Sequence, residues 1–224
     1  MENFFTGKRI LVIGASGVLG AEFVRQLQSS GAEVQLMART PLRMPTEFAD
    51  VPSAHVDIRS RLSLDSAFSE LNTNFDGVIN AAGVVAFGSL GEVPEEIVAE
   101  LFSTNALGVL NILSVAPFYL NPESFITSLT GVAADVSVLG MSAYCSSKAA
   151  AHSAMVIGAR ELRSKKIAVL DARPPHTETG LVTRALFGNA PKMPQGLEPS
   201  TVVRRVLDAL AAGEKDLPAD AFSS

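Results

Sequence analysis

The sequence predicts an α/β fold in which helices cover both faces of a doubly wound, parallel β-sheet. Short apolar runs rich in β-branched residues alternate with longer helical patterns along the chain, and this alternation is typical of parallel sheets. The apolar runs are continuous rather than alternating, as in strands that are buried on both faces. A glycine-rich turn follows the first run. The 224 residues, 47% of them hydrophobic, are enough for one domain with a buried core.

The expected elements follow the chain in order. Strands are predicted at Arg9–Ile13, Glu33–Ala38, Ala54–Asp57, Gly77–Asn80, Ser124–Ser128 and Ile167–Asp171. Helical patterns between these runs predict helices over Val18–Ser29, Leu62–Leu71, Glu95–Val115 and Ser142–Ser164.

The C-terminal part of the chain is less regular. Gly180–Pro199 has weak periodicity and predicts a helical excursion with a loop above the sheet, which we interpret as a substrate lid. Thr201–Ala212 is amphipathic and predicts a helix with Ser200 as its N-cap. The tail Glu214–Ser224 is expected to be frayed or packed as an edge. We therefore expect a single domain over residues 1–224, with 180–199 as the lid and 200–224 as the C-terminal helix and tail.

Composition argues against several classes of function. The net charge of −5 and the lack of a long basic run argue against a nucleic-acid partner. The one cysteine, Cys145, allows no internal disulfide and fits a reducing cytoplasm. His55, His152 and His176 lack metal-ligand spacing, so no metal site is expected.

No secretion signal or membrane span is expected either. The apolar stretch after Lys8 and Arg9 superficially resembles a signal peptide, but the glycines within it favour a strand followed by a loop. The apolar stretch nearest to a membrane span, Val109–Leu120, is interrupted by Asn111 and Pro117. The sequence therefore predicts a cytoplasmic protein without a membrane partner.

The glycine-rich turn predicts a phosphate-binding site. A strand runs into a Gly-x-x-Gly-x-x-Gly turn that opens a helix, formed by Gly14, Ala15, Ser16, Gly17, Val18, Leu19 and Gly20. Glycines let backbone N–H groups approach a pyrophosphate, and the positive end of the helix dipole favours that anion. An ordinary tight turn is the alternative interpretation.

The end of the second predicted strand indicates which dinucleotide binds. An acidic residue at this place would bind the ribose hydroxyls of NAD. The chain instead has Arg39, whose forked donors can pair with the 2′-phosphate of NADP, and Arg43 is a second candidate for the same contact. NADP(H) is therefore favoured, with NAD(H) and a merely solvated arginine as the alternatives.

A tyrosine and a lysine open the alanine-rich helix. Tyr144 and Lys148 are four residues apart and therefore lie on one helix face. A free tyrosine has a pKa of about 10, and a nearby ammonium lowers that pKa. Tyrosine then becomes a usable proton donor to a carbonyl or acceptor from an alcohol. Taken alone, the spacing is common by chance.

The order of these motifs resembles the short-chain dehydrogenase/reductase family. The resemblance runs from about Lys8 to Ala212 and rests on the glycine turn, Asp57-Ile58, Asn80-Ala81-Ala82-Gly83, Asn105 and the Tyr144…Lys148 pair. Two further segments are similar to family motifs, Ala143–Ala150 at the helix start and Pro174–Thr179 near the nicotinamide. The resemblance implies a single-domain Rossmann fold and a nicotinamide-dependent oxidoreductase.

The resemblance also implies a role for each matching residue. Tyr144 would be the acid–base residue, Lys148 would bind the nicotinamide ribose and tune Tyr144, and Asn105 would link Lys148 to solvent through a water or the helix geometry. Asp57 and Ile58 would lie beside the adenine. The remaining contacts with the cofactor and its central strand would come from Asn80, Ala81, Ala82, Gly83, Pro174, Thr177 and Thr179, of which Thr179 is a better positional match than Thr177.

The chain departs from the family pattern at three places. Its glycine spacing is that of the longer branch that modifies sugar nucleotides, but the chain is too short for that branch's extra domain. Pro175 replaces a glycine and stiffens the nicotinamide segment. Gly131 stands where the family has a serine whose hydroxyl binds the substrate oxygen. Thr130 is the nearest replacement and needs a local backbone twist to reach the site, whereas Ser128 and Ser142 are less suitable.

The leading hypothesis is NADP(H)-dependent hydride transfer to or from a small carbonyl or alcohol, with Tyr144 as acid–base residue and Thr130 in place of the serine. A cofactor-binding protein with impaired or no catalysis is the alternative that Gly131 motivates. A sugar-nucleotide epimerase or dehydratase is the alternative that the glycine spacing motivates. Apolar lid residues suggest an apolar substrate, and the family implies a homodimer or homotetramer. Those lid residues are Leu181, Val182, Leu186, Phe187 and Met193.

Overall fold

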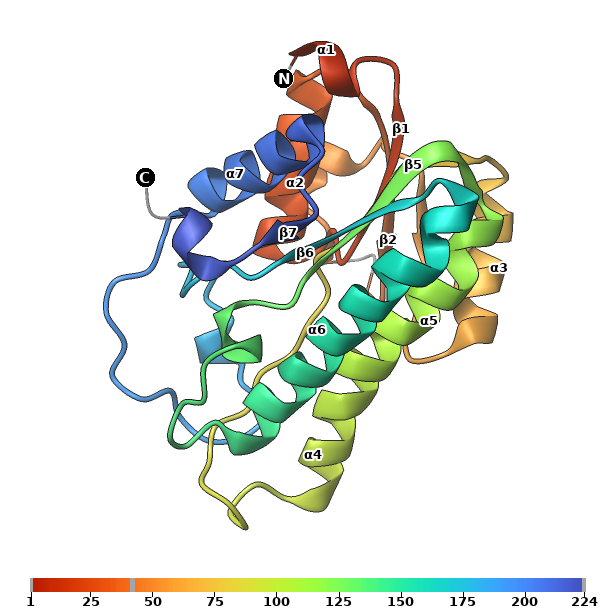
Figure 1. Ribbon diagram of the computed structural model, residues 1–224. Coiled ribbons are helices and arrows are strands. Elements are labelled where there is room, and N and C mark those ends of the chain that lie inside the picture. Colours follow the sequence, from red (N-terminus) through yellow and green to blue (C-terminus); the bar gives the residue numbers. More distant parts are fainter. Residues whose placement is uncertain (1, 41–42, 223–224) are drawn as a thin grey trace.

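The computed structural model describes residues 2–40 and 43–222 (Figure 1). At its centre lies a seven-stranded, fully parallel sheet in the order β3-β2-β1-β4-β5-β6-β7. The α/β class and the doubly wound parallel sheet are therefore confirmed. The strands are β1 Arg9–Ile13, β2 Glu33–Ala38, β3 Ser53–His55, β4 Phe75–Asn80, β5 Leu120–Leu129, β6 Ala168–Ala172 and β7 Asp216–Leu217.

Helices cover both faces of this sheet (Figure 1). Side chains of β1 point alternately to the two faces. Ile10 and Val12 pack with α2 and α7, whereas Leu11 and Ile13 pack with α3, α5 and α6. Two apolar cores, one on each face, thus hold the sheet. The α-helices are α1 Glu2–Phe5, α2 Val18–Ser29, α3 Arg61–Leu71, α4 Glu95–Leu101, α5 Gly108–Val115, α6 Ser142–Glu161 and α7 Pro199–Ala212.

Most predicted boundaries agree with the structure, and the differences have local causes. The third strand ends at His55 rather than Asp57, because the backbone N–H of Asp57 donates to the Ser63 hydroxyl. The predicted N-cap at Ser200 is wrong. Glu198 is the N-cap residue and Pro199 occupies the first turn of α7, where a missing N–H breaks no helical hydrogen bond. The described part of the tail packs as an edge, with β7 beside β6.

The helix predicted over Glu95–Val115 is interrupted. A π-helical segment, Phe102–Leu107, separates α4 from α5. Such segments are often found at functional sites. The whole helical stretch Glu95–Phe118 is long and apolar enough to cross a membrane, which corrects the expectation that no such segment exists. However, 61% of the most apolar 18 residues in this stretch are buried. The helix α5 also packs between α3 and α6, as the core helix of a globular protein does.

Candidate active site

A cavity of about 930 Å³ opens at the carboxyl ends of the parallel strands. It lies where the strand order reverses between β1 and β4, the usual ligand site of open α/β sheets. Its volume is in the range of ligand pockets. Most of the predicted site residues line it: Gly14, Ser16, Gly17, Val18, Leu19, Arg39, Asp57, Ile58, Ala81, Ala82, Gly83, Thr130, Tyr144, Lys148, Pro174, Thr177 and Thr179.

Four predicted residues lie behind the cavity wall instead. Ala15, Asn80 and Asn105 are almost fully buried, and Gly20 is buried in the first turns of α2. Asn80 donates from Nδ2 to the Ser128 hydroxyl at 2.9 Å and accepts from the Ala82 N–H at 3.1 Å. It therefore supports the loop after β4. The hydroxyl of Ser128 is already bonded to Asn80, so Ser128 is not a replacement for the missing serine.

The glycine turn places the start of α2 directly on the cavity. Gly14 has φ +83°, and a Cβ at this position would lie 2.7 Å from the backbone nitrogen of Ala82. Only glycine fits there without displacing the loop after β4. Gly17 is the N-cap residue of α2 and provides no side-chain cap. The positive end of this helix therefore faces the cavity without a side-chain acceptor, an arrangement that suits a bound phosphate.

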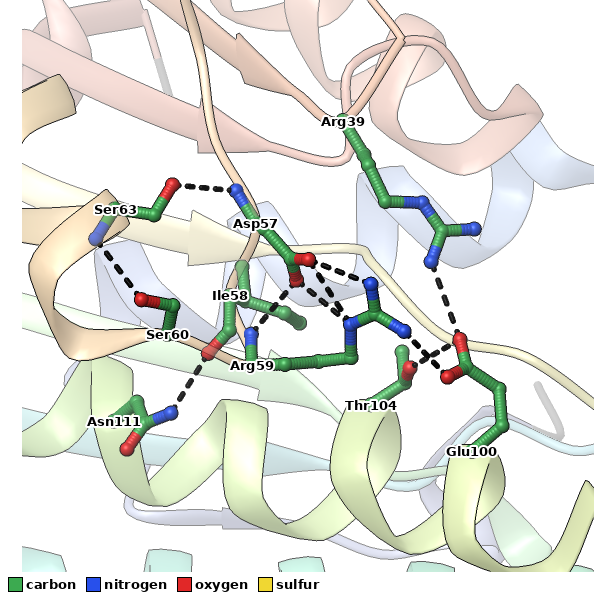
Figure 2. A network of polar contacts seen from close by, with 9 residues as sticks. All are labelled: Arg39, Asp57, Ile58, Arg59, Ser60, Ser63, Glu100, Thr104 and Asn111. Carbon is green, nitrogen blue, oxygen red and sulfur yellow. Dashed lines mark hydrogen bonds and ion pairs between the residues drawn. The ribbon is translucent and has the colours of Figure 1, made fainter. Parts of the chain in front are cut away.

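The end of the cavity beside Arg39, where the adenosine of a dinucleotide is expected, is bordered by a network of charged side chains, drawn in Figure 2. Arg39 follows β2 and donates from Nη1 to Glu100 Oε1 at 3.2 Å. Arg59 holds both oxygens of Asp57 at 2.6–3.1 Å and reaches Glu100 Oε2 at 2.5 Å. The hydrogen bond from Arg59 lowers the pKa of Asp57, so the carboxylate stays charged.

Sequence reasoning missed Arg59 and Glu100. Glu100 lies on α4, far along the chain from both arginines, and no local pattern links the three residues. The backbone beside them is fixed as well, because Asn111 of α5 donates to the Ile58 carbonyl at 2.9 Å. The predicted adenine pair, Asp57 and Ile58, therefore lies in a rigid loop on the cavity wall.

Tyr144 and Lys148 lie at the other end of the cavity, on successive turns of α6. The ammonium of Lys148 is 5.9 Å from the centre of the Tyr144 ring and donates to the Leu129 carbonyl at 2.9 Å. A Cβ added at Gly83 would lie 3.4 Å from Asn105 Oδ1 and 3.7 Å from Lys148 Nζ. The structure thus brings Tyr144, Lys148 and the loop after β4 together.

Asn105 lies in the π-helical segment, and its side chain makes three hydrogen bonds. Its Oδ1 accepts from the Val84 N–H at 3.0 Å, and its Nδ2 donates to the Val84 carbonyl at 2.9 Å and to Ser147 Oγ at 3.0 Å. These bonds connect the π-helical segment to the loop after β4 and to α6. Asn105 therefore maintains the helix geometry beside Lys148.

Burial determines the protonation of this pair. It raises the pKa of Tyr144 and lowers the pKa of Lys148 to about 8, while the charge of Asp171 partly offsets the second effect. The net lowering of the tyrosine pKa that the sequence predicts is therefore not seen, because burial dominates. Tyr144 is a neutral phenol near pH 7 and carries the proton that an acid catalyst must donate.

The Lys148 pKa makes stability depend on pH. Between about pH 8 and pH 10.5 the folded protein binds fewer protons at Lys148 than the unfolded chain does, so the contribution of Lys148 to the free energy of unfolding must rise with pH in this window. Below pH 8 both states are protonated and Lys148 adds no slope. We expect urea unfolding at pH 7.5, 8.5 and 9.5 to show wild type gaining stability relative to Lys148→Met. Parallel curves for the two proteins would contradict the lowered pKa.

Gly131, at the position where the family resemblance implies a serine, lies in the segment after β5. Gly131 has φ +79° and ψ 162°, and a Cβ added to it would have the Pro174 carbonyl oxygen as its nearest neighbour, at 3.9 Å. Space for a side chain therefore exists, but the backbone conformation is one that only glycine adopts readily. The N–H groups of both Thr130 and Gly131 donate to the Ala172 carbonyl, at 3.0 and 3.2 Å.

Thr130 does not present its hydroxyl to Tyr144 in this structure. Its Oγ1 donates to Asp171 Oδ1 on the neighbouring strand β6 at 2.6 Å. The residue lines the cavity, but its polar atom is committed to a buried carboxylate. Both the N–H and the hydroxyl of Thr130 bond to β6, so the twist that would bring this hydroxyl to the site is not seen.

Asp171 is the buried centre of an ion cluster that was not predicted from the sequence. It accepts from Arg173 Nη1 at 3.0 Å and lies 2.5 Å from His152 Nδ1, and it is only 4% exposed. Arg173 also pairs with Asp135 at 2.5 Å and with Asp216 at 2.7 Å. An aspartate within an otherwise apolar strand was the available signal. We call these residues the Asp171 cluster: Thr130, Asp135, His152, Asp171, Arg173 and Asp216.

The segment after β6 forms a further part of the cavity wall. Thr177 Oγ1 donates to the Pro175 carbonyl at 3.0 Å, and Thr179 Oγ1 accepts from the Leu181 N–H at 3.2 Å. Leu181, Val182 and Met193 line the cavity, as does His176. Leu186 and Phe187 instead form backbone hydrogen bonds with Val85 and Phe87. Among the described residues, no group of three or more acidic, histidine or cysteine side chains could hold a metal ion.

Comparison with known proteins identifies the family. The model of the family described as short chain dehydrogenase matches residues 8–186. The chain belongs to the short-chain dehydrogenase/reductase family. The Tyr144–Lys148 pair and the glycine turn both lie within the matched residues, and both line one cavity.

Three similar proteins share between 22% and 30% sequence identity with this short-chain dehydrogenase/reductase. The short chain dehydrogenase/reductase AacuN of Aspergillus aculeatus is 30% identical over 187 residues, covering 78% of this chain and 71% of the relative. Human L-xylulose reductase is 26% identical over 187 residues, covering 81% and 76%. A crystal structure of a short chain dehydrogenase from Burkholderia cenocepacia in complex with NADP has a TM-score of 0.85 at 22% identity, covering 98% and 91%. This last likeness shows the shared fold.

Proposed function

We propose that the protein is an NADP(H)-dependent oxidoreductase that transfers a hydride between the nicotinamide and a carbonyl or alcohol carbon of a small molecule. One observation carries the proposal: a single cavity has Arg39 and the glycine turn at one end and Tyr144 with Lys148 at the other. The related structure from Burkholderia cenocepacia is described as an NADP complex, which supports the choice of cofactor.

The residues present suit such a cofactor. Its pyrophosphate would lie against the start of α2, its 2′-phosphate beside Arg39 with Arg43 on the same wall, and its nicotinamide ribose beside Lys148. The segment with Pro174, Thr177 and Thr179 would border the nicotinamide ring. When bound, the cofactor supplies or accepts the hydride.

The protein itself would position the cofactor and the substrate and would provide a proton. The Tyr144 hydroxyl would donate its proton to the oxygen of a carbonyl as negative charge develops there, and would take it back in the reverse direction. The raised pKa of Tyr144 keeps that proton in place at neutral pH. Lys148 would hold the ribose and stabilise the phenolate left behind. Asn105 would keep the π-helical segment in register with α6.

The proposal also covers the chain's organisation. Residues 1–224 would act as one domain in which 180–199 form the substrate lid, and Leu181, Val182 and Met193 on the cavity wall favour an apolar substrate. Exposed apolar side chains on α5 and α6 support a homodimer or homotetramer, among them Leu110 and Ile157, each 46% exposed. A cytoplasmic location fits the single free cysteine.

A second candidate function is binding of NADP(H) with little or no catalysis. The observation that favours it is the pair of Gly131, which offers no hydroxyl, and Thr130, whose hydroxyl is bonded to Asp171. Losing one donor to a developing oxyanion lowers rates by about 10²–10³ in other enzymes. Tight NADPH binding without turnover across a broad panel of carbonyl compounds would favour this candidate over the first.

The cofactor proposal predicts a selective effect of Arg39→Ala. Charge-assisted hydrogen bonds to phosphate contribute about 1.5–3 kcal/mol, so we expect the variant to bind NADP⁺ at least about tenfold more weakly and NAD⁺ with unchanged affinity. Isothermal titration calorimetry with both nucleotides measures this difference. Arg160→Ala, which removes an exposed arginine on α6, is the matched control. Equal weakening for both nucleotides would contradict the 2′-phosphate contact.

A further inference from the structure

In the charged network at the adenosine end, Arg39 already pairs with a carboxylate of the protein. Glu100 on α4 accepts from Arg39 Nη1 at 3.2 Å, so that an ion pair joins the end of β2 to α4 at the edge of the cavity (Figure 2). The same carboxylate holds Arg59, which in turn holds Asp57. Two cations and two anions thus balance each other beside the position proposed for the 2′-phosphate.

We propose that Glu100 is an internal competitor of the 2′-phosphate for Arg39 and thereby determines how strongly the protein discriminates NADP(H) from NAD(H). The inference rests on the proposed NADP(H) binding and assigns a specificity role to a residue outside the cavity lining. Glu100 would lower the affinity for the phosphorylated cofactor, whereas the affinity for NAD(H) would not depend on it.

Arg39 is the residue that can leave this network with the smallest loss of contacts. Glu100 Oε2 is bonded to Arg59 at 2.5 Å, and Glu100 Oε1 also accepts from Thr104 Oγ1 at 3.2 Å. The Arg39 side chain is 51% exposed, compared with 35% for Arg59 and 24% for Glu100. Glu100 therefore keeps two partners when Arg39 leaves, and Arg39 is the side chain that borders the cavity.

The sign of the effect follows from the charges. A phosphate monoester carries about two negative charges near neutrality. It therefore attracts the Arg39 guanidinium more strongly than the singly charged Glu100 carboxylate does, and Arg39 exchanges one partner for the other. The exchange still breaks the Arg39–Glu100 pair and leaves a carboxylate near the phosphate, and both changes oppose binding. The ribose of NAD is uncharged at this position and requires neither change. Removing the Glu100 charge must therefore favour NADP(H) selectively.

The first experiment is the substitution Glu100→Gln, which keeps the shape and removes the charge. We expect this variant to bind NADP⁺ about two- to fivefold more tightly, which corresponds to the loss of an exposed ion pair, and NAD⁺ with unchanged affinity. The gain should shrink as salt is added, because salt screens exposed charges. Glu96→Gln on the same helix removes an exposed carboxylate and should change neither affinity.

A double-mutant cycle separates competition for Arg39 from simple repulsion. If Glu100 acts through Arg39, the gain from Glu100→Gln must shrink in the Arg39→Ala background to the part that repulsion between the carboxylate and the phosphate contributes. A gain of undiminished size there would overturn the competitor role. So would weaker NADP⁺ binding by Glu100→Gln, which would mean that Glu100 positions Arg39, or equal changes for both nucleotides, which would mean a contact with adenosine.

The cycle also separates this inference from the cofactor proposal. Selective loss of NADP⁺ binding in Arg39→Ala, together with no effect of Glu100→Gln, would remove only the role of Glu100. Wild-type protein that prefers NAD⁺, with no effect of Arg39→Ala, would overturn the NADP(H) proposal itself. Calorimetric affinities decide all of these outcomes without any knowledge of the substrate.

Discussion

Tyr144→Phe is expected to lower the turnover of a carbonyl substrate by about 10²–10⁴-fold, the usual contribution of a positioned acid–base group. The substitution removes the proton donor but keeps the ring that lies 5.9 Å from the Lys148 ammonium. The affinity for NADPH should therefore stay close to that of wild type. Oxidation of NADPH, followed by its absorbance in the presence of carbonyl compounds, measures the loss.

The second tyrosine of the chain provides a matched control. The hydroxyl of Tyr119 bonds to Asp65 and Ser69, and Tyr119 does not line the cavity. Tyr119→Phe should leave turnover unchanged. Turnover that survives in Tyr144→Phe, or that falls equally in both variants, would exclude Tyr144 as the acid–base residue.

Asp171→Ala is expected to lower the free energy of unfolding by about 3 kcal/mol, because it removes the anion of a buried ion pair. Arg173, His152 and the Thr130 hydroxyl would each lose a partner. The loss should lie at the lower end of the range for such pairs, since Arg173 keeps Asp135 and Asp216. Urea unfolding followed by circular dichroism measures the difference.

Asp216→Ala tests whether burial of the Asp171 carboxylate accounts for the expected loss of stability. Asp216 pairs with the same arginine, but its side chain is 57% exposed, and exposed pairs contribute about 0–1 kcal/mol. Equal destabilisation by Asp171→Ala and Asp216→Ala would mean that burial of the Asp171 carboxylate does not increase its contribution to the free energy of unfolding. Asp171→Asn, which keeps the shape, should be intermediate between wild type and Asp171→Ala.

Features with a local signature could be predicted from the sequence. Continuous apolar runs located the strands, and β1 and β2 have the predicted bounds. The glycine turn, the Tyr144–Lys148 spacing and Arg39 after β2 each depend on residues close together in the chain. The structure places all of them on one cavity, because parallel strands present their carboxyl ends at the same edge of a sheet.

Features that depend on contacts between distant segments could not be predicted. Glu100 meets Arg39 across 61 positions, and Thr130 meets Asp171 across 41. The direction of the Thr130 side chain follows from the turn at Gly131, where two N–H groups share the Ala172 carbonyl. The π-helical segment around Asn105 likewise depends on side-chain bonds to Val84 and Ser147 rather than on local propensity.

The conformation of Gly131 has a consequence for how such a site evolves. A serine at this position would fit the available space but would have to adopt φ +79°, a conformation that strains any residue with a side chain. Gaining a serine at this position therefore requires a second change that rebuilds the turn toward Ala172. Because the residue and the turn must change together, a hydroxyl can be gained by a single substitution more readily at another wall of the cavity.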